Sequence, residues 1–323
     1  MPRLFFGNFS FEHELADPHF QPSKTLIEQS AQWGTIWMKQ ASADDLFWLP
    51  STTPISPAGP TKVKFIATID ELITFLHKAN THYQFVPWGW SPRALAHYRM
   101  LPTCYVDAAP PPLDVVRYGN SRRFAFEMEQ QLGSVCIDGQ MQFHTLTTCI
   151  STAAELEDWN SRVSASTHSW VIKAEFGMSG RERILGQQDL QREQTAWCLK
   201  RLAMGQYLFA EPWLKRRDEV GIQWHIEGKD QIRLVGITRL ECSPTGQYQS
   251  SSPLVDPDSI AQWQPAIDHQ FTVVKKLTNL GYTGPLGIDA MRYLPLDFQN
   301  ADTALRPFQD INARWTMGRL ALG

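Results

Sequence analysis

Residues 170–184 read WVIKAEFGMSGRERI, and this stretch places a lysine inside an apolar run directly before a glycine-rich, basic segment. Trp170, Val171 and Ile172 are typical of a buried strand, because aromatic and β-branched side chains are favoured there. A lysine surrounded by apolar groups is costly unless its charge is met. Lys173 therefore needs either solvent or an opposite charge beside it.

Two interpretations of Lys173 remain open from this stretch alone. Alternation along a strand allows Lys173 to face solvent while Trp170 and Ala174 face the core. Alternatively, the lysine and the loop bind an anion, since Gly177 and Gly180 let the backbone approach a ligand and consecutive N–H groups can form an anion nest. The segment matches neither GxxxxGK[ST] nor GxSxG, so it is neither a P-loop nor a nucleophile elbow.

Two acidic strands near the end of the chain form a candidate metal site. Asp289 lies in GIDAMRY (287–293), and FQDINARWTMG (308–318) places Asp310 and Asn312 two residues apart. Residues i and i+2 of a strand share a face, to which a neighbouring strand can add Asp289. Three hard oxygen ligands suit Mg²⁺, although Asp and Asn are also common in turns and on solvated strand faces.

A crossing segment between these two ends carries further acids. YLFAEPWLKRRDEV (207–220) puts Glu211 at the end of an apolar strand, before Pro212. Such a segment can present a carboxylate and backbone groups to an adenine edge, and Asp218 or Glu219 can meet ribose hydroxyls. Taken alone, the pattern is more often that of an ordinary strand end.

The totals describe a globular chain with no global charge bias. Its 323 residues indicate two or three domains or subdomains. The formal net charge of −3 gives no reason to expect nucleic-acid binding, and no apolar run reaches the ~18–20 residues that cross a membrane. The five scattered cysteines include no CxxC pair, which favours reduced thiols in the cytoplasm.

The chain divides into two kinds of α/β pattern. In the first part, the candidate strands RLFFGNF, TIWMKQ (35–40) and YQFVPWGW alternate with helices, one of which has a capping-box start at Thr68. This alternation indicates a small, largely parallel sheet. After the proline-rich DAAPPPLD, short turns between strands indicate an α+β part built on antiparallel sheet. Its first helix is expected to begin at Asn120 and end at Gly133.

Taken in order, these pieces resemble the ATP-grasp superfamily. The order is strand lysine, glycine-rich segment, strand-end acid, second acid, metal aspartate and acid-x-Asn pair, and it covers about residues 115–323. The resemblance implies an α/β front domain followed by an α+β ATP-grasp fold whose two subdomains clamp a nucleotide. The implied units are a front domain at 1–117, an N-terminal ATP-grasp subdomain at 118–205 and a C-terminal ATP-grasp subdomain at 206–323.

The resemblance also implies ATP and Mg²⁺ (or Mn²⁺) as cofactors. The residues implied to bind the nucleotide are Lys173, Gly177, Ser179, Gly180, Arg181, Glu211, Trp213, Leu214 and Asp218, with Glu219 the alternative to Asp218. The residues implied to bind the metal are Asp289, Asp310 and Asn312. The segment 177–183 would close over the phosphates.

Two departures from the family pattern stand out. Many members carry Glu where this chain has Asp310. The shorter side chain of aspartate has a different reach to a metal. An earlier lysine, often found near the helix that corresponds to 120–133, is absent. Arg122 or Arg123 is the candidate replacement, although a planar guanidinium demands a different geometry from an ammonium.

The implied activity is a ligase reaction. ATP phosphorylates a carboxylate to an acylphosphate, and an amine, or less readily a thiol, displaces phosphate. Besides Lys173, Arg239 and Arg314 are the candidates to stabilise the oxyanion of the second step. Arg292 ranks lower, because it follows Asp289 by three residues and should face the other way. An ATP-dependent phosphotransferase and a nucleotide-binding regulatory protein without turnover are the alternatives.

The expected partners are small-molecule carboxylate and amine substrates, without nucleic acid or membrane, and a homodimer stays open. Two aromatic loops of the front domain, 7–14 and 87–93, are candidate acceptor contacts, because loops at strand ends of α/β domains often bind ligands. Trp88, Trp90 and Arg93 line such a pocket on this interpretation, whereas a packing role is the alternative for the tryptophans.

Overall fold

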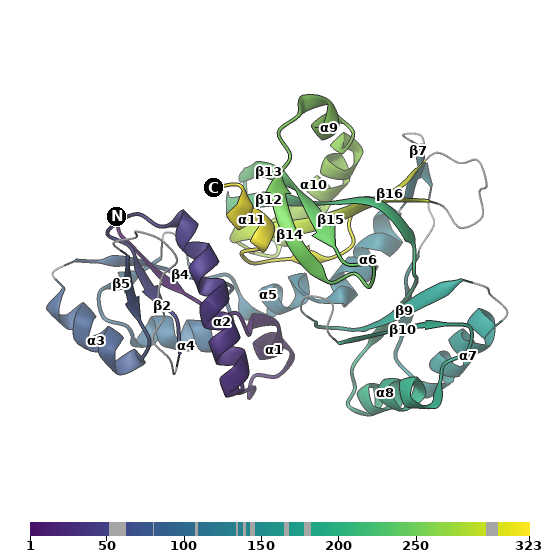
Figure 1. Ribbon diagram of the computed structural model, residues 1–323, viewed down its shortest axis with the longest axis horizontal. Helices are drawn as coiled ribbons and strands as arrows, with labels where there is room; N and C mark the ends of the chain where they lie inside the picture. Colours follow the sequence, from purple (N-terminus) through teal and green to yellow (C-terminus); the bar gives the residue numbers. More distant parts are fainter. Residues whose placement is uncertain are drawn as a thin grey trace.

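The computed structural model describes residues 1–51, 63–79, 81–106, 109–133, 135–137, 140–142, 146–164, 168–177, 182–294 and 303–323. Within these residues the chain forms three sheets, called A, B and C, and Figure 1 shows the sheet A part at one end of the long axis. Among the described residues, no helix combines the length and apolar character needed to cross a membrane.

Sheet A is the predicted parallel sheet, with the order β3-β2-β1-β4-β5. Its strands are β1 (Arg3–Phe6), β2 (Leu46–Trp48), β3 (Lys64–Ile66), β4 (Tyr83–Pro87) and β5 (Cys104–Tyr105). The helices around it are α1 (Phe11–Ala16), α2 (Lys24–Trp37), the 3₁₀ turn η1 (Met38–Gln40), α3 (Ile69–Lys78) and α4 (Pro92–Met100). The expected cap of α3 is confirmed, because the Thr68 hydroxyl accepts a hydrogen bond from the backbone N–H of Glu71 at 3.2 Å.

The predicted strand at 35–40 is wrong. Helix α2 continues to Trp37 and is followed directly by η1. Ala31, Gly34 and Trp37 are buried at helical spacing, and the Trp37 ring packs edge-on against Phe5 of β1 at 4.9 Å between centroids. Burial of this helical face outweighs the strand preference of the short sequence TIW.

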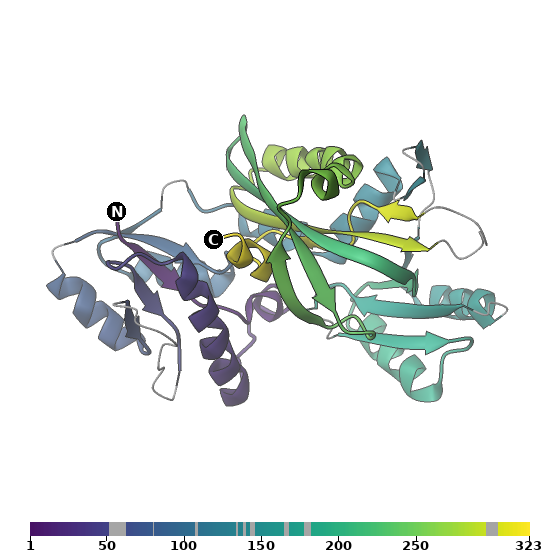
Figure 2. The same cartoon turned by 45° about the horizontal axis from the view of Figure 1, so that its top comes forward.

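Sheet C is antiparallel, with the order β10-β9-β11-β8. Its strands are β8 (Thr148–Ile150), β9 (Ser169–Ala174), β10 (Arg183–Gln187) and β11 (Leu208–Pro212). Figures 1 and 2 show α7 (Ala153–Ser164) and α8 (Arg192–Ala203) on the side of this sheet that faces away from sheet B. Trp170 and Ile172 share a separate core with these helices.

Sheet B is antiparallel, with the order β14-β13-β12-β15-β16-β6-β7, and β17 also pairs with β15. Its strands are β6 (Val135–Ile137), β7 (Gln140–Gln142), β12 (Lys215–Gly228), β13 (Gln231–Cys242), β14 (Tyr248–Pro253), β15 (Gly284–Leu294), β16 (Ala304–Arg306) and β17 (Ile311–Asn312). Its helices are α9 (Pro257–Ala261), α10 (Gln264–Asn279) and α11 (Met317–Ala321). The expected antiparallel α+β part is thereby confirmed.

Two helices, α5 (Leu113–Gly119) and α6 (Arg122–Leu132), connect sheet A to the rest of the chain. Ser121 rather than the expected Asn120 caps α6, and its hydroxyl accepts from the N–H of Phe124 at 3.2 Å. Gly133 ends α6 as expected, with φ of 73°, a conformation that only glycine adopts freely.

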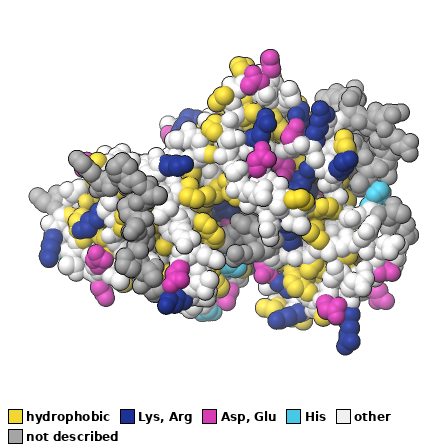
Figure 3. Space-filling view, viewed as in Figure 1, with side chains coloured by type: hydrophobic (Ala, Val, Ile, Leu, Met, Phe, Trp, Pro, Cys, Tyr) yellow, Lys and Arg dark blue, Asp and Glu magenta, His cyan; other side chains and the backbone are white. Residues whose placement is uncertain are grey.

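One large apolar core connects sheet A with sheet B. It includes Phe5 and Trp37 beside sheet A, Phe124 of α6, and Ile288 of β15. This shared core holds the loops after β1 and β4 against the end of the chain, where the N–H of Trp315 donates to the carbonyl of Trp88 at 3.0 Å. Figure 3 shows Lys and Arg intermixed with Asp and Glu over the face it presents.

Candidate active site

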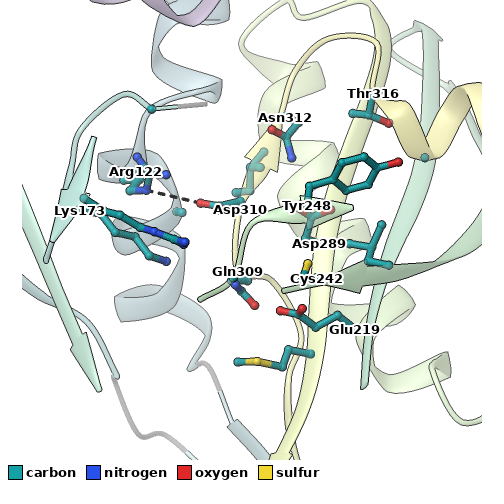
Figure 4. Close-up of a pocket in the computed structure, with 18 of the residues that line it drawn as sticks. Arg122, Lys173, Glu219, Cys242, Tyr248, Asp289, Gln309, Asp310, Asn312 and Thr316 are labelled. Atoms are coloured by element: carbon teal, nitrogen blue, oxygen red, sulfur yellow. Dashed lines mark ion pairs between the residues drawn. The ribbon is translucent and has the colours of Figure 1, made fainter. Parts of the chain in front are cut away.

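A pocket of about 390 Å³ is lined by residues of sheet B, sheet C and α6, and by loops and helices of the sheet A part. Sheet C and α6 contribute a basic wall that includes Arg122 and Lys173, and sheet B contributes an acidic wall opposite (Figure 4). The acidic wall is made of Glu219, Asp289 and Asp310, and Asn312 lies with them.

Lys173 lies on the pocket face of β9. Strand alternation directs Trp170 and Ile172 into the separate core and Lys173 to the opposite face. The lysine is 5% exposed, so it does not extend into open solvent. Its Nζ pairs with Oε2 of Glu211 at 3.0 Å, which supplies the opposite charge that a buried ammonium needs.

Glu211 lines the pocket from β11, and its carboxylate is occupied by two cations. Oε2 accepts from Lys173 at 3.0 Å and from Nη1 of Arg306 at 2.8 Å. Burial opposes ionisation of this carboxyl, but Arg306 and Lys173 outweigh burial and hold its pKa far below the usual range. Arg306 also pairs with Glu129 of α6 at 3.1 Å, so sheet B, sheet C and α6 meet in one buried ionic network.

Asp289, Asp310 and Asn312 come together because β15 and β17 are antiparallel neighbours. Gly287 is paired with Asn312 in the register, and the N–H of Asp289 donates to the carbonyl of Asp310 at 3.0 Å. Burial, and then the negative charges of Asp310 and Glu219, raise the pKa of Asp289 to about 8, against the opposing effect of Arg314 and Asn312. Asp310 lies 3.5 Å from Nε of Arg122 and Glu219 pairs with Arg216 at 3.1 Å, whereas Asp289 forms no ion pair among the described residues.

No group of three or more His, Cys, Asp and Glu side chains in the described parts of the chain is arranged to hold a metal ion. Asp289, Asp310 and Asn312 amount to two carboxylates and an amide. Such a set fits Mg²⁺ only when water and phosphate oxygens complete the shell, as is usual for this ion.

Of the two arginines considered for the missing lysine, Arg122 lines the pocket. Its Nη1 donates to the carbonyl of Ala174 at 2.7 Å, and its Nε lies 3.5 Å from Oδ1 of Asp310 (Figure 4). Arg123 instead forms an exposed pair with Glu127 on α6. Arg122 is therefore the candidate that lies between the two walls.

Two predicted site residues lie elsewhere. Asp218 is paired with Arg292, Nε to Oδ1 at 2.7 Å and Nη2 to Oδ2 at 2.5 Å, outside the described lining of the pocket. Its neighbour Glu219 is buried and lines the pocket instead. A register irregularity in β12 between Arg216 and Asp218 breaks the simple alternation along this strand.

Arg239, predicted as a catalytic residue, is also outside the described lining of the pocket. It is exposed on β13, and Leu240 lines the pocket in its place. Successive strand residues face opposite sides, so the arginine points away. Arg314 does line the pocket, where its Nη2 donates to Oδ1 of Asn312 at 3.0 Å. Arg292 faces away, as expected from its spacing to Asp289.

The remaining predicted nucleotide contacts divide between two groups. Gly177, Trp213 and Leu214 line the pocket. Ser179, Gly180 and Arg181 lie outside the described residues, and so does most of the segment 177–183 to which closure was assigned.

The front end of the pocket is built by the loops after β1 and β4 and by helices α1 and α2. Phe9, Glu12, Trp33 and Trp88 line it. Trp90 instead packs against Phe85 and Tyr98, and the Nη2 of Arg93 donates to the carbonyl of Phe20 at 2.8 Å, away from this lining. Of the three residues considered for an acceptor pocket, only Trp88 is among the described residues that line it.

Several polar residues of the pocket were not predicted from the sequence. They include Gln223, Cys242, Tyr248, Arg306, Gln309 and Thr316. A signal for Gln223 exists in the sequence, because Glu219, Gly221 and Gln223 alternate with apolar residues along β12, and Gln223 is buried. A row of polar residues on one face of a buried strand indicates a lined cavity.

Comparison with solved structures identifies this arrangement as the ATP-grasp fold. An N5-carboxyaminoimidazole synthetase from Staphylococcus aureus, complexed with ADP, superposes with a TM-score of 0.55 at 12% identity, covering 98% of this chain and 71% of that chain. The biotin carboxylase domain of a 2-oxoglutarate carboxylase from Hydrogenobacter thermophilus, with MgADP, ADP and bicarbonate, gives 0.53 at 10% identity, covering 99% and 68%.

The D-cycloserine synthetase DcsG gives a TM-score of 0.51 at 13% identity, covering 100% of this chain and 94% of that chain. No family model matches the sequence, and the search of curated proteins found no match. The likeness to these structures therefore establishes the fold, in agreement with the order of motifs along the chain.

Proposed function

We propose that this protein is an ATP-dependent ligase that activates a substrate carboxylate as an acylphosphate and joins it to an amine, releasing ADP and phosphate. The observation that carries the proposal is the pocket itself. Cations on one wall, Lys173 and Arg122, face the hard oxygen atoms of Asp289, Asp310 and Asn312 on the other (Figure 4). A phosphoryl group between these walls meets positive charge on one side and metal ligands on the other.

The acidic wall fits a divalent cation. The raised pKa of Asp289, at about 8, follows from burial and from repulsion by Asp310 and Glu219, and a cation placed there would relieve that repulsion. Asp289, Asp310 and Asn312 would hold Mg²⁺ or Mn²⁺, which would neutralise charge on the phosphates. Among the solved structures named above, one contains ADP and another MgADP.

The chain's own residues have distinct tasks in this reaction. Lys173 is held in place by Glu211 and presents its charge to phosphate oxygens. After Pro212, Leu214 offers backbone groups to the base and Trp213 offers its carbonyl, because the N–H of Trp213 donates to the carbonyl of Ser169 at 2.8 Å. Glu219 is placed to meet the ribose. The Nε of Arg314 has no hydrogen-bond partner among the described residues, so it is free to stabilise an acyl oxyanion.

The test is turnover that depends on an acid and a nucleophile together. ADP release is measured with ATP, Mg²⁺ and a panel of carboxylic acids, with hydroxylamine as a general amine that traps an acylphosphate as a hydroxamate. We expect hydroxamate formation with at least one acid. ADP release without hydroxamate would favour a phosphotransferase, and nucleotide binding without ADP release would favour a regulatory protein, so either result overturns the ligase assignment.

Two variants locate the chemistry. Asp310→Asn and Asn312→Ala should lower turnover far more than they lower the free energy of unfolding, because their task is charge stabilisation in the transition state. Glu227→Gln, which changes an exposed residue of β12, is the control. Equal losses in the control and in Asp310→Asn would contradict the assignment.

Other parts of the proposal concern organisation. We propose the units 1–117, 118–205 and 206–323, although β11, after residue 205, pairs within sheet C. A homodimer and a cytoplasmic location are proposed as well. The free thiols of Cys104, Cys149, Cys198 and Cys242 support the location.

A further inference from the structure

Glu12 of α1 is a buried carboxylate at the front end of the pocket. It is 5% exposed and lines the same cavity as the aromatic residues Phe9, Trp33 and Trp88. None of the roles derived above for nucleotide, metal or acyl oxyanion uses this side chain.

The two oxygens of Glu12 are incompletely satisfied. Oε1 forms an ion pair with Arg314, while Oε2 accepts no hydrogen bond from any residue that the structure describes. An ionised oxygen buried without a donor is costly, and that cost is removed only when a donor arrives.

Glu14, two residues further along the same helix, shows that the fold can satisfy such a group. It is 3% exposed, and its carboxylate accepts from the hydroxyls of Ser10 at 2.7 Å and Ser91 at 2.5 Å. The chain thus provides donors for one buried glutamate of α1 and leaves the pocket-facing one short of a donor.

Both terminal nitrogens of Arg314 also have backbone or side-chain partners other than Glu12. Its Nη1 donates to the carbonyl of Trp315 at 2.9 Å and its Nη2 to Oδ1 of Asn312 at 3.0 Å. These contacts hold the guanidinium beside Asn312, and Oε2 of Glu12, a residue that lines the pocket, has no donor among the described residues.

The surrounding rings indicate the chemical class of the missing donor. The ring centroids of Phe9 and Trp88 are 4.6 Å apart, and those of Phe9 and Trp33 are 6.1 Å apart. Aromatic faces attract cations and tolerate apolar groups, whereas a carboxylate repels anions. A carboxylate that lines one cavity with three aromatic rings therefore suits an ammonium group that carries an apolar substituent.

We propose that Glu12, Phe9, Trp33 and Trp88 form the binding site for the amine substrate, and that this substrate is a protonated primary amine with an apolar substituent. This proposal rests on the proposed function, because the proposed ligase reaction requires an amine substrate. It assigns Oε2 of Glu12 to the ammonium and the rings to the substituent. Arg314 connects this site to Asn312, so the amine enters the same cavity as the activated acid.

The test compares two probes that differ in charge. Phenethylammonium chloride and its neutral analogue 2-phenylethanol are titrated into the full chain at pH 7 without nucleotide, and binding is followed by ligand-observed NMR. We expect the ammonium to bind at least about tenfold more tightly, which corresponds to about 1.4 kcal/mol. Equal affinities, or no binding of either probe, would overturn the proposal.

Three variants sharpen this comparison. Glu12→Gln keeps the shape of the side chain and should abolish the preference for the ammonium. Glu71→Gln, at an exposed position of α3, should keep that preference. If Glu12→Gln fails to fold, Trp33→Leu provides the second test, since it removes a ring but not an apolar surface and should narrow the preference about two- to fivefold. An unchanged preference in either pocket variant contradicts the proposal.

The outcome is separable from that of the ligase assignment. The same samples are titrated with ATP and Mg²⁺. If the wild-type protein binds no nucleotide, the proposed function fails while the probe comparison still stands. If nucleotide binds and the ammonium preference is absent, the amine site fails alone.

Discussion

Glu211 and Asp289 are two carboxyl groups of one pocket, and their surroundings are opposite. Glu211 lies between Lys173 and Arg306, which hold its pKa far below the usual range against the effect of burial. Asp289 lies beside Asp310 and Glu219, and burial together with these like charges raises its pKa to about 8. The first acid is neutralised by the protein, and the second is left for a cation from outside.

This difference separates a positioning group from a binding group. Removing Glu211, Lys173 or Arg306 leaves a buried charge without its partner. Removing the carboxyl group of Asp289 instead relieves its repulsion with Asp310 and Glu219. Substitution of Glu211 should therefore lower the free energy of unfolding, whereas substitution of Asp289 should not lower it and should act on ligand affinity instead.

The largest effect on stability is expected from Glu211 and its two cationic partners. Glu211→Ala leaves Lys173 and Arg306 without their shared partner in the interior, so the free energy of unfolding should fall by about 3–5 kcal/mol. Urea denaturation measures it. Glu227→Ala, which removes an exposed partner of Arg233 at 3.8 Å, is the control and should cost less than about 1 kcal/mol. A similar small loss for both would show that Glu211 does not hold the network together.

The pH dependence of stability tests Asp289 in the acidic wall. Asp289 has its pKa raised, so between about pH 4 and pH 8 the folded protein keeps a proton that the unfolded chain has lost. Stability of the metal-free protein should therefore fall as pH rises through this window, by at most about 1.4 kcal/mol per pH unit. Glu211 has the opposite sign, and its contribution is lost only in acid, as pH falls below the unfolded value.

Asp289→Asn isolates this effect. The variant should flatten the decline in stability between pH 5 and pH 8 and should be at least as stable as wild type at pH 7. Thermal unfolding without Mg²⁺ at several pH values is the measurement. A decline that persists unchanged in the variant would assign it to another group.

Nucleotide affinity should show the next largest effect. Lys173→Ala removes a charge-assisted phosphate contact worth about 1.5–3 kcal/mol, so the affinity for ATP with Mg²⁺ should fall about 10- to 100-fold. Calorimetric titration compares it with Lys200→Ala, an exposed lysine of α8, which should bind as wild type does. Equal affinities in wild type and Lys173→Ala would remove this lysine from the nucleotide site.

The smallest effect is expected from Asp218. Its pair with Arg292 lies outside the pocket lining with both side chains partly exposed, so Asp218→Asn should change ATP affinity less than about twofold and stability by about 0–1 kcal/mol. Glu219→Gln should weaken ATP binding more. The reverse order would return the ribose contact to Asp218.

The positions of Lys173, Asp289, Asp310 and Asn312 could be predicted because each rests on a short-range rule. Alternation places Lys173 opposite the core residues of β9, and an i, i+2 spacing brings Asp310 and Asn312 to one wall. The parallel sheet A and the antiparallel second part likewise follow from the local order of strands, helices and turns.

The expected and observed positions differ where contacts between distant segments decide which face of a strand a side chain takes. Arg239 and Leu240 are equally compatible with a strand, and only the register of β13 with β12 determines which faces the pocket. The irregularity near Asp218 acts in the same way. Arg306 carries no local signal at all, because its partner Glu211 is 95 residues away in the sequence.

The bridge between Arg306 and Glu211 also limits how the two walls can move. Arg306 belongs to sheet B and Glu211 to sheet C, and both are almost completely buried. Pulling the sheets apart at this point would strand opposite charges in the interior, at a cost comparable with a large part of the stability of a domain. A movement of one sheet relative to the other that keeps this bridge intact avoids that cost, so the bridge ties β16 to β11 at this point of the pocket.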